Sequence, residues 1–166
     1  MRTPSQWLPL LSVIAAVGSG LMAGLFFVFS NTVMRALSDL PPAAGMQAMQ
    51  RINVVIVNPL FLLVFLGTGT VCLGVAALTA TAPEVPGHAW LLAASVCYVV
   101  GIVGVTMAFN VPLNNALDRV AAESASVAWP AYVIAWLRWN HVRTVTGALA
   151  VGSFAWGLFR YGSQAH

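Results

Sequence analysis

Four groups of polar residues interrupt an otherwise apolar chain, and they hold most of the side chains that could do chemistry. The groups are Asn31 and Arg35; Arg51, Asn53 and Asn58; Asn110, Asn114 and Asn115; and Asn140, His141, Arg143 and Thr144. Each group lies at the end or the start of an apolar stretch long enough to cross a bilayer. Since consecutive spans run in opposite directions, all four groups are predicted to lie at one membrane face. The sequence therefore predicts a single polar layer that could bind a ligand.

This polar layer is rich in asparagine and arginine and poor in acidic residues. Asp118 is the only acid near it, because Asp39 lies in a loop, so a carboxylate-bridged metal site is excluded. His141 is its only histidine, whereas histidine-based metal sites use two or more; we predict no metal site. Walker, Rossmann and nucleophile-elbow motifs are absent. No acidic residue lies in the middle of a span, which argues against a proton-coupled transporter. The remaining neutral donors and fixed positive charge suit carbonyl or phenolate oxygens and can stabilise a developing oxyanion.

Helical spacing predicts which residues of the last group face the same way. At 100° per residue, Trp136, Asn140, Arg143 and Gly147 fall within about 60° of one another. A charge in the middle of a bilayer costs roughly 2.5–3.5 kcal/mol even on insertion scales. This stripe is therefore expected to face the interior of the protein rather than lipid.

Two pairs on other spans are expected to approach this stripe. Arg51 and Asn58 are seven residues apart on one helix face, and Asn110 and Asn114 come from the third span. Each of these residues could bind a ligand or could have a structural role, because asparagine and arginine at helix ends also cap backbone carbonyls or tie helices together. Both interpretations remain open. For His141 two roles also remain open: it could make a hydrogen bond at the membrane interface, or it could act as a general base.

The composition is that of a membrane protein. The 166 residues are 60% hydrophobic and 7% charged, against about a quarter charged in soluble domains, and the mean hydropathy is +0.86. The predicted spans are Trp7–Val33, Val54–Ala80, Ala89–Phe109 and Val142–Phe159, the last beginning as early as Pro130. In lipid each must be helical. We therefore predict an all-α integral membrane four-helix bundle that forms one domain over residues 1–166.

The loops at the polar end are predicted to contain short helices. Pro41 and Pro42 break any helix, and the residues after them could form a short helix across the mouth of the bundle. Pro112 is predicted to end the third span, with a short interfacial helix at Leu113–Ala122. The first span is too long for a signal peptide's apolar region and is kept as a permanent helix.

Aromatic and small residues indicate further surfaces. Four aromatic residues come within eleven positions: Trp129, Tyr132, Trp136 and Trp139. They could form an aromatic belt at the lipid headgroups, or some of them could form the wall of a flat apolar pocket. The two interpretations are compatible if the pocket lies at the depth of the membrane interface. Gly20 and Gly24 have the spacing of close helix packing, which would serve the bundle or a homo-oligomer.

Arginine placement predicts the orientation of the protein. The polar end carries five of the seven basic residues, and the other end carries the remaining two: Arg35, Arg51, Arg119, Arg138 and Arg143 against Arg2 and Arg160. The positive-inside rule then places the polar layer on the cytoplasmic side, in what we expect to be the inner (plasma) membrane of a bacterium. These arginines are too dispersed to follow a phosphate backbone, so no nucleic-acid partner is expected.

Several short runs resemble a known family. They are Ser30-Asn31-Thr32, Arg51-Ile52-Asn53 with Asn58-Pro59, Asn110-Val111-Pro112-Leu113-Asn114, and Trp136-Leu137-Arg138-Trp139-Asn140-His141-Val142-Arg143-Thr144. With these runs the chain resembles the anthrone oxygenase-like family of small four-helix membrane proteins, many of them long catalogued as a domain of unknown function. The resemblance extends over nearly the whole chain, and its most specific parts are N-x-P-L-N and W-x3-N-x2-R.

The resemblance implies an activity and a set of site residues. Members of the family in polyketide pathways oxidise an anthrone to an anthraquinone with O2, without a bound flavin or haem, so no cofactor is expected. By motif position, the resemblance implies as site residues Asn110, Asn114, Trp136, Asn140 and Arg143. An anthrone's central methylene is acidic because its carbanion is an extended phenolate, which can give an electron to O2 directly.

Roles for the individual residues follow from this chemistry. Arg143 with Asn140 or Asn114 is expected to bind the oxyanion, and Trp136 to lie against the ring. His141 is expected to act as the base, an inference from the reaction and not from the family. Arg51 and Asn58 complete the expected substrate-binding set.

Two classes of function are carried forward. The first is a cofactor-independent membrane oxygenase, a monooxygenase that acts on a flat phenolic or anthrone-like hydrophobic compound. The alternative is a non-catalytic membrane module that binds a lipid, a quinone or a partner protein through the same layer. A transition-metal enzyme ranks below both because of the histidine count. In the first class, His141→Ala is expected to remove turnover and leave ligand binding; in the second there is no turnover to remove.

Overall fold

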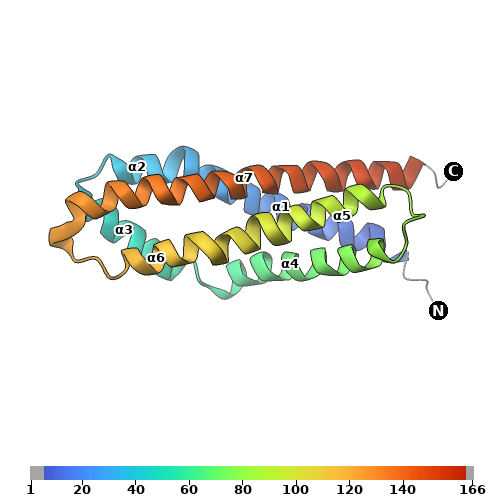
Figure 1. Cartoon of the computed structure of the whole chain (residues 1–166), viewed down its shortest axis with the longest axis horizontal. Helices are drawn as coiled ribbons and strands as arrows, with labels where there is room; N and C mark the ends of the chain where they lie inside the picture. Colours follow the sequence, from blue (N-terminus) through green and yellow to red (C-terminus); the bar gives the residue numbers. More distant parts are fainter. Residues whose placement is uncertain (1–5, 164–166) are drawn as a thin grey trace.

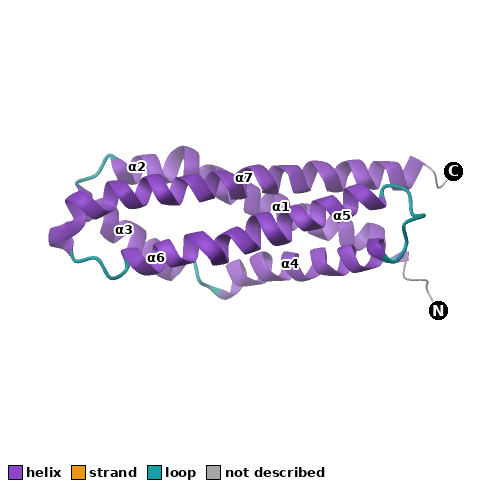
Figure 2. Ribbon diagram, in the orientation of Figure 1, coloured by secondary structure: helices purple, strands orange, loops and turns teal. Residues whose placement is uncertain are grey.

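A computed structural model of the chain describes residues 6–163, which form helices and no strand (Figures 1 and 2). In chain order the elements are α1 (Leu8–Val28), the π-helix η2 (Phe29–Val33), α2 (Met34–Ser38), α3 (Pro42–Val55), α4 (Pro59–Ala80), α5 (His88–Val96), the π-helices η3 (Cys97–Gly104) and η4 (Thr106–Asn110), α6 (Val111–Leu117), the 3-10 helix η5 (Ala122–Ser124) and α7 (Ala125–Ser163). The all-α prediction is confirmed.

Four helical stretches of the described residues are long and apolar enough to cross a membrane. They are Leu8–Ser38, Pro59–Ala80, His88–Leu117 and Ala122–Ser163. All four of the predicted spans are present, and the first, third and fourth extend further than predicted. Helix α7, which makes up most of the fourth, begins at Ala125, with Pro130 inside its second turn. The protein is therefore an integral membrane helical bundle.

The molecule is elongated and has two halves (Figure 1). Helices α1, α4 and α5 lie beside the last part of α7 in one half, here called the membrane half. Helices α2, α3 and α6 surround the first part of α7 in the other, here called the cap half. Each half has its own hydrophobic cluster, containing Phe26 in the membrane half and Trp136 in the cap half. The short helix predicted after Pro41 and Pro42 is thus α3, whereas α6 is the last part of the third span and not the separate helix predicted at Leu113–Ala122.

The third span continues through Pro112, and the prediction that it ends there is wrong. The helical stretch runs unbroken from His88 to Leu117. Its turns before the proline are π-helical, so the N–H of Val111 bonds the carbonyl of Thr106, five residues earlier. In an α-helix the proline ring would clash with the carbonyl four residues back; the wider π turn accommodates it. This widened helix brings Asn110 and the residues after it into the cap half.

Glycines let the helices of the membrane half approach closely at specific points. A Cβ on Gly147 of α7 would lie 2.8 Å from the Cβ of Ala23 on α1. By contrast, a Cβ on Gly24 would meet nothing within 4 Å, and one on Gly20 only Val151 at 3.8 Å. The Gly20/Gly24 pair is therefore not used for close packing within the chain, and its role between copies stays a prediction.

Replacing Gly87 by alanine is expected to destabilise the fold. Gly87 precedes α5 with a φ of +82°, and a Cβ there would overlap the backbone carbonyl of Gly157 on α7. The left-handed conformation costs roughly 1–2 kcal/mol with a side chain, and overpacking about 1–3 kcal/mol more. The melting temperature in detergent should fall by several degrees. Gly74→Ala, where the Cβ meets nothing within 4 Å, is the matched control; equal melting temperatures for the two variants would contradict the prediction.

Candidate functional site

The inward face of α7 is a continuous stripe along its whole length. Its buried residues are Ala125, Trp129, Tyr132, Trp136, Asn140, Arg143, Gly147, Ala150, Phe154 and Gly157. The prediction that Trp136, Asn140, Arg143 and Gly147 face the interior is confirmed. Trp136 is 4% exposed, Asn140 0% and Arg143 5%. Two strongly polar side chains are therefore buried where the two halves of the molecule meet.

Asn140 ties α7 to the end of α1. Its amide nitrogen donates to the carbonyl of Phe26 at 2.7 Å and to Ser30 Oγ at 2.6 Å. The π-helical turn Phe29–Val33 lies directly beside this contact, and an inserted side chain is one of the known causes of such irregular turns. Its oxygen remains free to accept a hydrogen bond from α7 itself.

Arg143 is held by neutral groups and by aromatic faces. One terminal nitrogen donates to Asn140 Oδ1 at 2.6 Å and the other to Thr106 Oγ1 at 3.2 Å. The guanidinium carbon lies 4.1 Å from the ring centroid of Phe26 and 5.2 Å from that of Trp136. Its Nε–H has no acceptor. The side chain is thus held by polar and aromatic groups, and its Nε is a donor nitrogen without a partner.

No carboxylate neutralises this buried cation. All four acidic residues of the chain lie at the surface: Asp39, Glu84, Asp118 and Glu123. Burying a charge without a counter-charge carries a penalty of several kcal/mol, which amide dipoles and aromatic faces offset only in part. An anionic ligand beside Arg143 would supply the missing charge. The site is therefore electrostatically suited to an oxyanion.

A cavity of about 120 Å³ lies directly against Arg143. Its polar lining residues are Asn53, Thr106, Asn110, Asn114 and Arg143, and its apolar ones are Leu25, Phe26, Phe29, Met49, Ile52, Ile56, Val57, Phe61, Val111 and Trp136. These residues come from the end of the first span, from α3, from the start of α4, from the end of the third span and from α7. Polar residues from three of the four predicted groups thus line one cavity, whereas Asn31 and Arg35 of the first group are exposed and do not line it.

The two asparagines of the third span have different partners. Asn114 Oδ1 accepts from Tyr132 Oη at 2.9 Å and from Trp136 Nε1 at 3.0 Å, which fixes the indole against the cavity. Asn110 is 1% exposed; its amide nitrogen donates to the carbonyl of Trp136 at 3.4 Å, and its oxygen has no partner. Asn53 Nδ2 on α3 is also unpartnered. The cavity therefore offers an unused acceptor and unused donors to a ligand.

Three of the predicted site residues lie elsewhere. Asn58 is the N-cap of α4: its oxygen accepts from the N–H of Phe61 at 3.0 Å, and its nitrogen donates to the carbonyl of Val55 at 3.1 Å. Arg51 is exposed on α3, outside the cavity. His141 is exposed on the flank of α7 and does not line the cavity. A general base must come within hydrogen-bond reach of its proton, so the geometry does not support His141 in that role.

Sequence reasoning missed Phe26 and Thr106, which both contact Arg143. Thr106 carried a usable signal, because it lies one helical turn before Asn110 and therefore shares its face. Phe26 carried none, since it is one of many apolar residues in the first span. Of the aromatic cluster, Trp136 lines the cavity, whereas Trp129 and Tyr132 are buried in the cap half. Of the four aromatic residues, Trp136 alone lines this cavity, and the pocket interpretation stays a prediction.

The fold and the site together define a class of protein. It is an integral membrane helical bundle with a buried, uncompensated guanidinium and a tryptophan beside a small cavity. Within residues 6–163, no three His, Cys, Asp or Glu side chains come together as a metal site. Residues 61–153, more than half of the chain, match the family described as Anthrone oxygenase. The chain therefore belongs to the anthrone oxygenase family, as its motifs indicated. No curated protein and no solved structure matches it.

Proposed function

We propose that this protein is a membrane oxygenase that oxidises a flat, phenolic, anthrone-like compound with O2. The observation that carries the proposal is the buried Arg143, which has neutral partners, an unused Nε–H and the Trp136 ring beside it. This arrangement matches an aromatic anion, since the charge attracts the oxyanion and the ring covers the aromatic face. Membership of the anthrone oxygenase family supports the same reaction class.

The reaction needs no redox group besides its two substrates. The anthrone methylene loses one proton and becomes an extended phenolate, which transfers an electron to O2 to give a carbon radical and superoxide. Their combination forms a C–O bond, and protonation gives a hydroperoxide. Loss of the remaining C–H proton and cleavage of the O–O bond release water and leave the quinone carbonyl. The methylene gives up four electrons, and O2 takes up four.

Arg143 would act on the three anions of this sequence. It stabilises the phenolate in the bound substrate, and it lies where superoxide and the peroxide anion would form next to the ring. Electrostatic stabilisation of developing charge is often the largest single contribution to catalysis. Asn110 Oδ1 and Asn53 Nδ2, which have no partners in the protein, would orient the hydroxyl and carbonyl groups of the substrate.

Oxygen consumption is the direct test of this proposal. The purified protein, in detergent, is given 1,8-dihydroxyanthrone, and oxygen uptake and quinone formation are compared with the spontaneous rate. With ¹⁸O2, the quinone should gain one labelled oxygen and the second should appear in water. A rate equal to the spontaneous one would reject the oxygenase; retained binding of the compound would then favour a non-catalytic membrane module.

His141→Ala is expected to leave kcat/KM within about threefold of the parent protein. The side chain is exposed and away from the cavity, and no histidine or carboxylate lines the cavity. The substrate would therefore bind as its anion, and kcat/KM should rise with pH through the pKa of the free substrate, because this ratio reports on free enzyme and free substrate. Rates are measured from pH 5 to 9, with the spontaneous oxidation subtracted. A rise of kcat/KM with pH that is present in the parent protein and absent in the variant would restore His141 as the base.

A further inference from the structure

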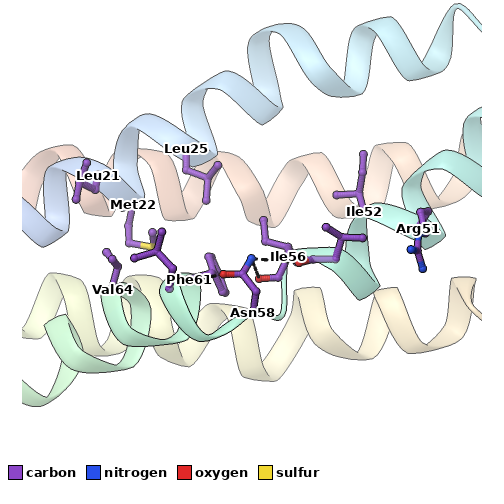
Figure 3. A pocket seen from close by; sticks show the side chains of 11 residues that line it. Leu21, Met22, Leu25, Arg51, Ile52, Ile56, Asn58, Phe61 and Val64 are labelled. Carbon is purple, nitrogen blue, oxygen red and sulfur yellow. Dashed lines mark hydrogen bonds between the residues drawn. The ribbon is translucent and has the colours of Figure 1, made fainter.

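An open groove lies on one side of the molecule (Figure 3). It has a volume of about 620 Å³ and runs between α1, the last turn of α3 and the first turns of α4. Its lining is almost entirely aliphatic and aromatic, with Arg51 at one end and Asn58 at the α3–α4 turn. Because Asn58 is occupied as a helix cap, Arg51 is the free polar group of the groove.

The groove and the cavity share one wall. Leu25, Ile52, Ile56 and Phe61 line both spaces, so a single layer of side chains separates them. Ile52 lies in the last turn of α3, Ile56 is the C-cap residue that follows it, and Phe61 lies in the first turn of α4. Ile56 and Phe61 are thus among the side chains that separate the two spaces.

The size of the cavity shows why the groove matters. At about 120 Å³, the cavity is well below the roughly 300–1,000 Å³ of ordinary small-molecule sites. It accommodates about one hydroxylated ring beside Arg143 and Trp136, but not a fused system of three. The groove, at about 620 Å³, supplies the remaining volume.

The groove opens toward the region where lipid chains would lie. Leu21 on α1 is 57% exposed and Leu60 on α4 is 72% exposed, and both belong to helical stretches apolar enough to span a membrane. A compound dissolved among acyl chains therefore reaches the groove sideways, without crossing water. Arg51 at the groove's end would attract a phenolate oxygen during this approach.

We infer that the groove and the cavity form one bipartite binding site for a polycyclic, membrane-dissolved phenol. The oxyanion-bearing ring enters the cavity beside Arg143, and the remaining rings stay in the groove between α1 and α4. This inference rests on the proposed function for its ligand class, and it adds that single-ring phenols fit the cavity alone. The chain would therefore select substrates by the number of fused rings.

Binding of two ligands of different size tests the inference. The protein is placed in nanodiscs, and the Kd values of 1,8-dihydroxyanthraquinone and of phenol are measured by titration calorimetry against empty nanodiscs. Leu21→Trp and Leu60→Trp fill the groove from opposite sides, and both positions line the groove but not the cavity. Val17→Trp on α1, at a residue 60% exposed and outside the groove, is the matched control.

The expected result is a selective loss of affinity for the three-ring ligand. Each groove variant should raise the Kd of the anthraquinone at least tenfold and change that of phenol less than twofold, whereas Val17→Trp changes neither. An unchanged anthraquinone Kd in both groove variants, or an equal loss for both ligands, would overturn the inference, as would a parent protein that binds only phenol. Anthraquinone binding that responds as expected, without oxygen uptake from the anthrone, would reject the proposed oxygenase alone.

Discussion

Replacing Arg143 by methionine is expected to lower kcat for anthrone oxidation by about 10²–10³-fold. This is the usual effect of removing one preorganised group that stabilises an oxyanion. Methionine is chosen because it is also long and unbranched, so the charge is lost while most of the packing against Phe26 and Trp136 is kept. Quinone formation is measured at saturating substrate, with the spontaneous rate subtracted.

Arg143→Lys separates charge from geometry. Lysine keeps the positive charge but, with a single ammonium, does not reproduce the planar guanidinium that reaches Asn140 and Thr106 at once. Its kcat should fall between those of the parent and the methionine variant, about tenfold below the parent. Melting temperatures show whether each variant is folded. A folded methionine variant that turns over at the parent rate would remove Arg143 from the catalytic site.

Changing Asn140 to aspartate is expected to weaken binding of an anionic ligand by about 10–100-fold. The carboxylate would lie 2.6 Å from an Arg143 nitrogen, where the amide oxygen lies now, and would neutralise the guanidinium as an internal ion pair. It would also lose the amide hydrogens that reach Phe26 and Ser30. The Kd of 1,8-dihydroxyanthraquinone is measured above and below the pKa of its phenol group, where the ligand is anionic and neutral.

The effect should depend on the charge of the ligand. The aspartate variant should bind the anionic form far more weakly than the parent protein does, and the neutral form with only a few-fold loss. Asn115→Asp makes the same chemical change at an exposed position on α6 and should leave both affinities unchanged. Equal weakening of both ligand forms by Asn140→Asp would mean that Asn140 acts only as a structural tie between helices.

The inward stripe of α7 was predictable because it depends only on local spacing. A helix fixes the angle between Trp136, Asn140 and Arg143, and the energetic penalty of exposing a guanidinium to lipid fixes which way that face turns. Asn110 and Asn114 were predicted differently, from the convergence of the span ends and from the N-x-P-L-N run of the family. For the α7 residues no knowledge of the neighbouring helices was needed.

The positions of the remaining predicted residues depend on where helices end and on π-helical turns, which residue spacing does not reveal. Asn58 shares a face with Arg51 only if the helix is continuous, but α3 ends at Val55 and α4 begins at Pro59, which makes Asn58 a cap. Pro112 favoured a helix end, and the π turns before it allowed the helix to continue. His141 follows Asn140 directly, and the 100° between neighbours was enough to place it on the outer face of α7.

The unequal lengths of α4 and α7 make the position of the cavity sensitive to the lipid. At 1.5 Å per residue, the 22 residues of α4 extend about 33 Å and the 39 residues of α7 about 58 Å. Of these two helices, α4 is the one that matches the hydrocarbon thickness of a typical bilayer, about 30 Å, and its first turn borders both the cavity and the groove. Hydrophobic mismatch at this short helix is relieved by tilting or by local thinning of the bilayer. Acyl-chain length therefore sets the depth at which the groove opens, and with it the concentration of dissolved aromatic compound that the protein meets.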